Sequence, residues 1–363
     1  GHEDHIGAIP YLYQKVGSED IPMYGGRLTL ELAKAKFERK DAKLPKEKII
    51  KGRSILKISK YFTVEFVKVT HSIADSYSLS IKTPAGHVFV TGDFKIDLTP
   101  VDNEKVDFVR LSELGEEGVD LMLSDSTNSE VEGFTPSERS VGDAFRQEFQ
   151  KATGRIVVAV FASHVHRIQQ IIDTAAQFGR KIAIDGRSLL KVFEIAPSVG
   201  RLNIPKNILI PISAVEQFQD DEVVILCTGT QGEPLAALSR IAKNMHKHIV
   251  LREGDTVIIS STPIPGNEKA VSKVINELSM KGAEVIFQDT HVSGHACQEE
   301  IKLMYSLLKP KFALPVHGEY RHLMAGRGLA EAVGIPSENV LIMSSGDVVE
   351  LGEDSCKIVG HVE

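Results

Sequence analysis

The sequence is poor in cysteine. Its three cysteines, Cys227, Cys297 and Cys356, lie far apart and form no C-x-x-C pair. This spacing excludes a thiolate zinc site and a disulfide framework, because both need cysteines in close pairs or dense sets. A reducing compartment fits this cysteine usage, so we predict a cytoplasmic protein.

The sequence also lacks long apolar runs and an excess of basic residues. No window approaches the roughly 18 consecutive apolar residues of a membrane helix, so we predict no membrane span. The 42 Lys and Arg residues against 49 Asp and Glu residues give a net charge of −7. The chain as a whole therefore has no electrostatic attraction to nucleic acid or anionic lipid, although a local basic channel stays possible.

Internal repeats and low-complexity segments are absent as well. With 42% apolar and 25% charged residues, the composition is that of an ordinary globular protein. A length of 363 residues exceeds one average domain, so we expect two structural units. Because the chain opens at Gly1 without a Met, we expect the natural protein to have an earlier segment.

The predicted strands follow two hydrophobic patterns, one in the first part of the chain and the other in the later part. Residues 62–69, 77–82 and 88–91 alternate between apolar and polar side chains, which predicts an antiparallel meander. Later strands are short and continuously apolar, and segments of helix length separate them, which predicts a parallel, doubly wound sheet. These later strands are residues 155–160, 181–184, 223–226, 256–259 and 284–287.

These patterns predict an α/β protein in which one unit interrupts another. A helix start near Thr135 marks the first boundary, since Thr-Pro-Ser-Glu is a typical helix amino-terminus. We therefore predict a first unit at residues 1–134, a second at 135–289, and a return to the first at 290–363.

Histidine and aspartate side chains gather where a metal ion could be bound. His2, Asp4 and His5 form an H-x-D-H cluster, and imidazole and carboxylate are ligands that Zn²⁺ accepts. His71, Asp93 and His317 each follow a predicted strand. Alone, each would more often be a structural histidine or a turn aspartate. Together they favour a metal site.

The same residues belong to motifs that resemble a known family. Gly-His-Glu-Asp-His at the start is similar to the last five positions of the H-x-H-x-D-H signature of the metallo-β-lactamase superfamily. Later motifs resemble its β-CASP nucleases, and the ribonuclease J family most of all. They are Thr70-His-Ser72, Thr91-Gly-Asp93, Ser124-Asp-Ser-Thr127, Thr228-Gly-Thr-Gln-Gly-Glu233, Ser293-Gly-His295 and Val316-His-Gly-Glu319.

The resemblance implies a fold and a set of metal ligands. The fold would be a metallo-β-lactamase αββα sandwich, truncated at its amino-terminus, with an inserted doubly wound β-CASP domain. Two zinc ions would be bound, with manganese or magnesium as alternatives. His2, His71 and Asp93 would hold one ion. Asp4, His5, Asp93 and His317 would hold the other, so that Asp93 bridges.

The resemblance also implies catalytic and substrate-binding roles. Asp4, Asp125 and His295 would be catalytic: Asp125 would orient a ligand histidine, and His295 would protonate the leaving 3′ oxygen. From their sequence context alone, Asp125 would be interpreted as a helix or turn cap and His295 as a loop histidine. Ser163 and His164, opposite Ser293 and His295, would hold a 5′-phosphate, with His166 and Arg167 as second choices.

The expected activity is that of a metal-dependent ribonuclease. It would act as a 5′-to-3′ exonuclease on 5′-monophosphorylated RNA and as an endonuclease, in RNA maturation and decay. RNA would be the binding partner. The protein would assemble as a homo-oligomer or as a hetero-oligomer with a paralogue, and it could belong to an RNA-decay complex. The charge-rich stretch 40–51 could contact RNA phosphates, although such stretches are usually solvated.

Two other functions compete with this hypothesis. One is a catalytically weak partner subunit of an active ribonuclease, which would be expected to have lost metal ligands. The other is a hydrolase of a small ester or lactam on the same scaffold. The long doubly wound insert argues against the latter, because a small substrate needs no such wall.

Overall fold

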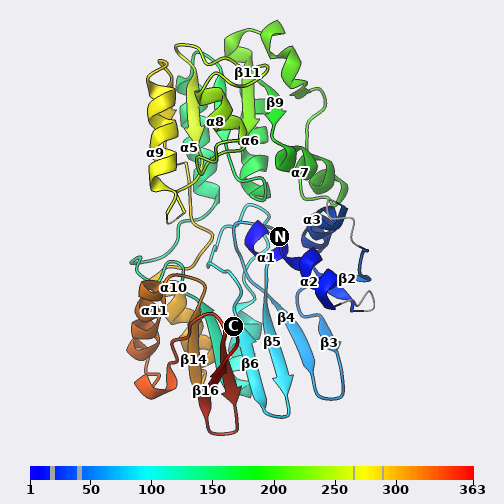
Figure 1. Cartoon of the computed structure of the whole chain (residues 1–363), viewed down its shortest axis with the longest axis vertical. Coiled ribbons are helices and arrows are strands. Elements are labelled where there is room, and N and C mark those ends of the chain that lie inside the picture. Colours follow the sequence, from blue (N-terminus) through cyan, green and yellow to red (C-terminus); the bar gives the residue numbers. More distant parts are fainter. Residues whose placement is uncertain (17–20, 39–42, 265, 288–289) are drawn as a thin grey trace. The chain divides into compact units, whose positions relative to one another are not determined.

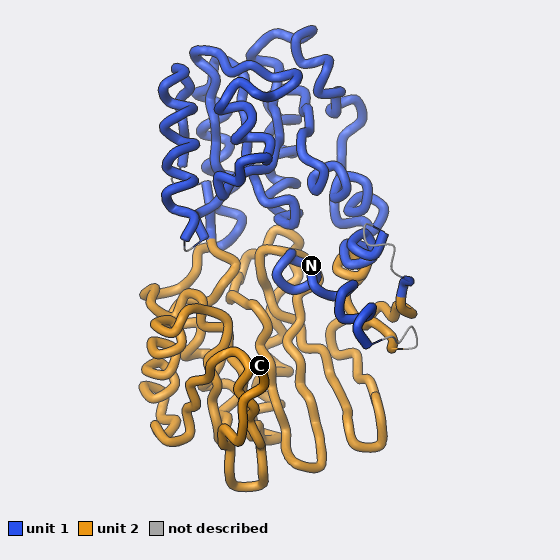
Figure 2. Tube along the Cα trace, in the orientation of Figure 1, with its two compact units in different colours: residues 1–19, 31–44, 137–292 blue, residues 20–30, 45–136, 293–363 orange. Residues whose placement is uncertain are grey.

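The computed structural model describes residues 1–16, 21–38, 43–264, 266–287 and 290–363. Its chain forms two compact units (Figure 2). Unit 1 comprises residues 1–19, 31–44 and 137–292, and unit 2 comprises residues 20–30, 45–136 and 293–363. The predicted domain boundaries stay predictions, and residue 289, the predicted end of the second domain, lies outside the described residues.

Unit 2 contains a six-stranded mixed sheet with the strand order β14-β7-β6-β5-β4-β3 (Figure 1). Strands β3 to β6 are antiparallel, which confirms the predicted meander, whereas β6, β7 and β14 run parallel. The strands are β3 (Ile55–Lys57), β4 (Thr63–Lys68), β5 (Tyr77–Thr83), β6 (Gly86–Val90), β7 (Leu121–Asp125) and β14 (Phe312–Val316).

Successive side chains of β4 point to opposite faces of this sheet, and each face packs against a different layer of the protein. Val67 faces a core shared with three helices, α4 (Phe108–Glu117), α10 (Gln298–Leu308) and α11 (Tyr320–Ala332). Val64 and Phe66 point to the other face, where they pack with Tyr24 of a small parallel pair, β1 (Met23–Gly25) and β2 (Glu47–Ile49).

A hairpin covers another part of that second face. It consists of β15 (Asp347–Leu351) and β16 (Cys356–His361). Val349 and Leu351 of the hairpin pack against Phe312 and Leu314 of β14. The sheet is therefore enclosed by helices on one side and by short strands on the other.

Unit 1 contains a parallel six-stranded sheet with the order β10-β9-β11-β8-β12-β13, as the apolar runs predict. Every residue of β8, β11 and β12 is buried, as is typical of strands covered on both faces. The strands are β8 (Ile156–Ala159), β9 (Lys181–Asp185), β10 (Leu209–Ile210), β11 (Val223–Cys227), β12 (Thr256–Ile259) and β13 (Glu284–Ile286).

Helices connect these strands and bury their faces. Helices α8 and α9 share a core with alternate residues of the sheet, among them Val157 and Val257. Helices α5 and α6 pack against each other (Figure 1). The helices of unit 1 that follow residue 137 are α5 (Arg139–Lys151), α6 (Val165–Gln177), α7 (Arg187–Ser198), α8 (Ala237–Ala242) and α9 (Glu268–Ser279). The earlier helices of the chain are α1 (Glu3–Ile6), α2 (Ile9–Val16) and α3 (Arg27–Glu38).

A buried ion pair fixes both ends of the long segment of unit 1. Arg167 of α6 is fully buried and binds both carboxylate oxygens of Glu138, at 2.8 and 3.0 Å. The same guanidinium donates to the carbonyls of Ser260 and Val292. Because Glu138 and Val292 lie at the two ends of this segment, one side chain holds the entering and the leaving chain together.

Candidate metal centre

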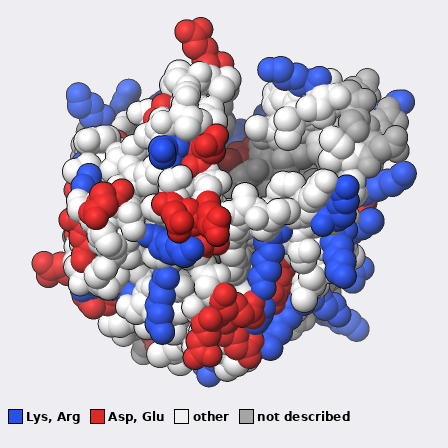
Figure 3. Space-filling model, turned by 90° about the horizontal axis from the view of Figure 1, so that it is seen from below, with Lys and Arg blue, Asp and Glu red and all other residues white. Residues whose placement is uncertain are grey.

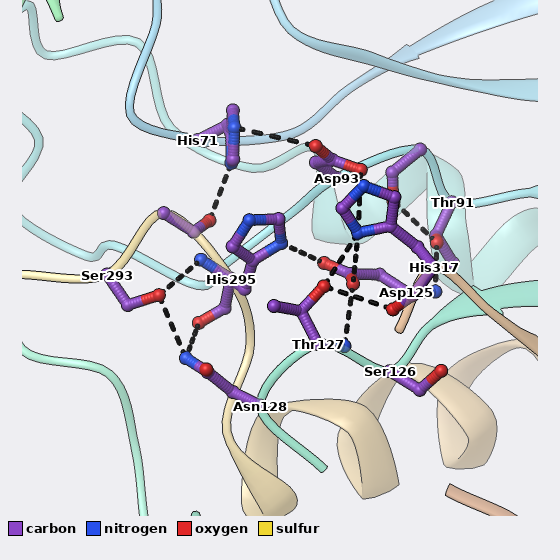
Figure 4. A network of polar contacts seen from close by, with 12 residues as sticks. His71, Thr91, Asp93, Asp125, Ser126, Thr127, Asn128, Ser293, His295 and His317 are labelled. Carbon is purple, nitrogen blue, oxygen red and sulfur yellow. Dashed lines mark hydrogen bonds and ion pairs between the residues drawn. The ribbon is translucent and has the colours of Figure 1, made fainter. Parts of the chain in front are cut away.

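The direction of four strands brings distant side chains to one edge of the sheet in unit 2. Strands β4, β6, β7 and β14 run the same way, so their carboxyl ends lie at the same edge. His71 follows β4, Asp93 follows β6, Asp125 ends β7 and His317 follows β14. Four segments that are far apart in sequence therefore present their polar residues together (Figure 4).

Asp93, Asp125, His295 and His317 form a compact group at this edge. Each offers one ligand atom, and these atoms all lie within 4.8 Å of one another. His71 lies beside them, with its Nε2 atom 3.8 Å from Oδ2 of Asp93. Imidazole nitrogens and carboxylate oxygens are the ligands that zinc and related divalent ions accept, so the donor set fits a metal ion.

The backbone fixes the orientation of His71. Its Nδ1 atom lies 2.7 Å from the carbonyl oxygen of Gly294. Because a carbonyl can only accept, Nδ1 carries a proton, and in the neutral ring the lone pair of Nε2 faces the carboxylate of Asp93. Two acceptors that face each other are best satisfied by a cation between them, and metal-binding histidines are typically held by such a backbone contact.

Asp125 and His295 are joined by a hydrogen bond of 2.7 Å between Oδ2 and Nδ1 (Figure 4). Burial raises the pKa of Asp125, but the charge and hydrogen bonds of His295 and His317 outweigh it and hold this pKa well below its usual range. Burial lowers the pKa of His295, and the negative charge of Asp125 more than reverses this and raises it. The pair therefore favours an ionised carboxylate beside a protonated ring.

His317 is held in an uncommon backbone conformation. Its φ angle is +62°, in the left-handed region that residues with a Cβ atom seldom adopt. Its Nδ1 atom lies 2.6 Å from the hydroxyl of Thr127, and 3.9 and 3.7 Å from the carboxylates of Asp93 and Asp125. Such conformations cluster at functional sites, where the surrounding structure enforces them.

The residues predicted for the metal site and the phosphate pocket are divided between the two units. His2, Asp4 and His5 belong to unit 1, so their predicted approach to His71, Asp93 and His317 stays a prediction. Within unit 1, Nδ1 of His2 lies 2.6 Å from the hydroxyl of Ser163, and its ring lies edge-on to His164 at 5.4 Å.

Ser163 and His164 precede helix α6, at its amino-terminus, while Ser293 and His295 lie in unit 2, so a shared phosphate pocket is likewise a prediction. Arg167, a second choice for phosphate binding, has its donors engaged inside unit 1. It is therefore unsuited to that role. Cys297 is buried, and burial raises the pKa of its thiol, which fits a structural residue.

Two residues to which the sequence assigned no role hold the site together. Asn128 donates from Nδ2 to the hydroxyl of Ser293 at 2.9 Å and to the carbonyl of His295 at 3.1 Å. It stands directly after the motif Ser124-Asp-Ser-Thr127, which could have drawn attention to it. Glu300 lies in α10 and had no such signal.

The carboxylate of Glu300 is fully buried and ties three segments together. It accepts hydrogen bonds from the backbone N–H groups of Ile96 at 2.6 Å, Thr135 at 2.7 Å and Cys297 at 2.8 Å. Ile96 follows Asp93 by three residues and Cys297 follows His295 by two. Glu300 therefore positions the two loops that carry these site residues.

Comparisons with known proteins identify the family. The model of the ribonuclease J β-CASP domain matches residues 153–278, and the model of the Zn-dependent metallo-hydrolase RNA specificity domain matches residues 283–342. Ribonuclease J of Synechocystis is 47% identical over 100% of the chain and 57% of its own length.

The chain belongs to the ribonuclease J family.

Further relatives agree with this assignment. Ribonuclease J of Thermus thermophilus is 43% identical over 100% of the chain and 64% of its own length. Ribonuclease J2 of Bacillus subtilis is 41% identical over 99% of the chain and 64% of its own length. The chain thus spans less than two thirds of these ribonuclease J relatives.

The fold is that of the ribonuclease J family, a metallo-β-lactamase unit with an inserted β-CASP unit, as the sequence predicts. A solved structure of an Enterococcus faecalis protein of unknown function has the same fold, with a TM-score of 0.63 at 14% identity. The superposition covers 94% of this chain and 76% of the Enterococcus faecalis chain. Among the described residues, no helix is both long and apolar enough to cross a membrane.

We predict that Glu300→Gln loosens the site. In glutamine an NH₂ group replaces one of the two carboxylate oxygens, and NH₂ cannot accept a hydrogen bond. At least one buried backbone N–H group therefore loses its acceptor, which lowers the free energy of unfolding by about 1–3 kcal/mol. Urea unfolding should show this loss of stability, and the variant should bind metal more weakly. Glu299→Gln is the matched control, because the side chain of Glu299 is 43% exposed and pairs with Lys302 on the surface. Equal midpoints for the two variants would contradict the role of Glu300.

We predict that the stability of the chelator-treated protein depends on pH through Asp125 and His295. The raised pKa of His295 stabilises the fold below about pH 6.5, and this is lost as the pH rises through the folded-state pKa. The lowered pKa of Asp125 stabilises it above about pH 4. The urea midpoint should therefore fall between pH 6 and pH 9. Asp125→Asn should flatten this slope, and an unchanged slope would refute the coupling.

Proposed function

We propose that this chain is the catalytic part of a metal-dependent ribonuclease. It removes nucleotides from a 5′-monophosphorylated RNA end and also cuts internally, in RNA maturation and decay. The observation that carries this proposal is the cluster of Asp93, Asp125, His295 and His317 at one edge of the sheet. The names of the relatives and of the two matching family models support RNA as the substrate and a metal as the cofactor.

The metals in this proposal are two zinc ions, with manganese or magnesium as alternatives. Bound divalent cations make water a usable nucleophile near neutral pH and neutralise phosphate oxygens. The residues that would hold them are His2, Asp4, His5, His71, Asp93 and His317. The contact between His71 and the Gly294 carbonyl supports its assignment, because it directs Nε2 toward the carboxylate of Asp93.

His295 is the proton donor in this proposal, and Asp125 positions it. The hydrogen bond from Nδ1 to Asp125 fixes the ring and leaves Nε2 to face the substrate. The negative charge of Asp125 also raises the pKa of His295, so the ring holds a proton that it can give to the leaving 3′ oxygen. Breaking the phosphorus–oxygen bond leaves a 3′ hydroxyl on one product and a 5′-phosphate on the other.

The 5′-phosphate of the RNA is bound by Ser163, His164, Ser293 and His295. Ser163 and His164 lie just before helix α6, whose first backbone N–H groups favour an anion. Ser293 accepts from Asn128 and from the N–H of His295, so its own proton can be donated.

The setting of the enzyme is also a proposal. We place it in the cytoplasm, as a homo-oligomer or as a hetero-oligomer with a paralogue, within a complex for RNA decay. The numbered name of the relative in Bacillus subtilis, ribonuclease J2, supports the existence of paralogues.

The first test compares two RNAs that differ only at the 5′ end, one with a monophosphate and one with a triphosphate. Mononucleotides should be released from the monophosphorylated RNA. His71→Ala should lower this rate by about a hundredfold or more, because even indirect metal partners often contribute tenfold or more. His361→Ala is a matched control, since His361 pairs with Asp347 in the exposed hairpin. Bound metal without cleavage of either RNA would favour a catalytically weak partner subunit.

The second test asks whether His295 protonates the leaving group. His295→Ala should slow cleavage of ordinary RNA by about 10²–10⁴-fold, the usual contribution of general acid catalysis. A substrate with sulfur in place of the bridging 3′ oxygen needs no such proton, so the variant should cleave it at nearly the wild-type rate. Equal slowing on both substrates would show that His295 acts in another way.

A further inference from the structure

A strongly basic stretch of the chain reaches the edge strand of the sheet in unit 2, outside the candidate metal centre. We call residues 46–62 the edge strip. It carries six cations and a single acid, Glu47, and so has a net charge of +5 in a chain of net charge −7. All six cations are exposed. They are Lys46, Lys48, Lys51, Arg53, Lys57 and Lys60.

The fold turns this stretch of sequence into a continuous surface. The strip contains β2, the edge strand β3 and the turn that leads into β4. Arg53, in the middle of the strip, lies near the carboxyl end of β4, where its N–H donates to the carbonyl of Phe66, five residues before His71. From Arg53 the strip follows β3 antiparallel to β4 and reaches the turn at the amino end of β4, so its second half lies along the lateral edge of the sheet.

Most of this positive charge is not neutralised within the protein. Arg53 is paired with Asp107 through two hydrogen bonds of 2.6 and 2.8 Å. In contrast, Lys51, Lys57 and Lys60 have no acidic partner among the described residues. Figure 3 shows Lys and Arg side chains gathered along the right-hand side of the face seen from below, the side on which β3 lies in Figure 1.

Aromatic side chains accompany the cations. Tyr61 and Phe62 are 54% and 48% exposed in the turn between β3 and β4. The ammonium of Lys60 lies over the ring of Tyr61, 4.6 Å from its centroid. Exposed aromatic rings between cations are typical of surfaces on which nucleic-acid bases stack while their phosphates are neutralised.

We propose that the edge strip binds single-stranded RNA, beyond the nucleotides that the metal centre holds. This rests on the proposed ribonuclease function and adds a second binding surface for long substrates. The lysines bind backbone phosphates, and Tyr61 and Phe62 stack on bases. Such binding is independent of sequence, because every base has a stacking face.

An acidic protein segment is the main competitor, and two features argue against it. Strand β3 has only three residues, which gives a pairing segment little to extend. An acidic segment would also gain nothing specific from two neighbouring half-exposed rings. The two partners therefore differ in whether the aromatic residues matter.

The test measures binding of fluorescent oligouridylates of 4 and 20 nucleotides that carry 2′-O-methyl and phosphorothioate groups to resist hydrolysis. Lys57→Ala/Lys60→Ala should weaken binding of the 20-mer about tenfold. It should also lower the salt slope by about 1.4, because each phosphate that the protein no longer neutralises removes about 0.7. Tyr61→Ala should weaken binding of the 20-mer about fivefold or more. Binding of the 4-mer should stay unchanged.

Lys243→Ala/Lys247→Ala is the matched control, since it removes two exposed lysines of unit 1. Equal loss in both double variants, or equal loss for both RNA lengths, would overturn the proposal. Two results together would assign the strip to an acidic protein instead. Lys57→Ala/Lys60→Ala would abolish binding of polyglutamate, and Tyr61→Ala would leave RNA binding intact. The assay needs no hydrolysis, so absence of cleavage in every variant would refute only the ribonuclease function.

Discussion

The shared direction of four strands is the constraint on which the candidate site depends. Strands β4, β6, β7 and β14 all deliver the chain to one edge of the sheet, and each is followed or ended there by a polar residue. A register slip of one residue would turn each side chain to the other face. The apolar alternation that buries Val67 on one face and Phe66 on the other therefore also fixes the positions of His71 and its neighbours.

Buried carboxylates reinforce this arrangement. Asp125 and Glu300 are nearly or fully buried, and a buried charge is tolerated only when its hydrogen bonds are satisfied. Asp125 is held by His295 and by the N–H of Thr127, and Glu300 by three backbone N–H groups. Because a partly satisfied network would cost more than none, these groups favour a single geometry of the loops around Asp93 and His295.

Much of the fold could be predicted from the sequence, because its signals are local. The period of two around Tyr77 and the continuous apolar run at Val223 distinguish the antiparallel from the parallel strands. The placement of His71 and Asp93 at strand ends follows from the same patterns. The motif resemblance adds their chemical roles, which periodicity alone cannot give.

The positions that sequence analysis missed depend on partners that no local pattern specifies. Glu300 looks like one acid among several on an amphipathic helix, yet it binds the N–H group of Ile96, 204 residues away. The left-handed backbone of His317 likewise arises from its surroundings in the fold. The edge strip lies between these cases: its charge is visible in the sequence, but only the edge position of β3 leaves it exposed along the sheet. A net negative chain can therefore still present a row of exposed cations along β3, and Arg53 in this row lies near the carboxyl end of β4, the strand that His71 follows.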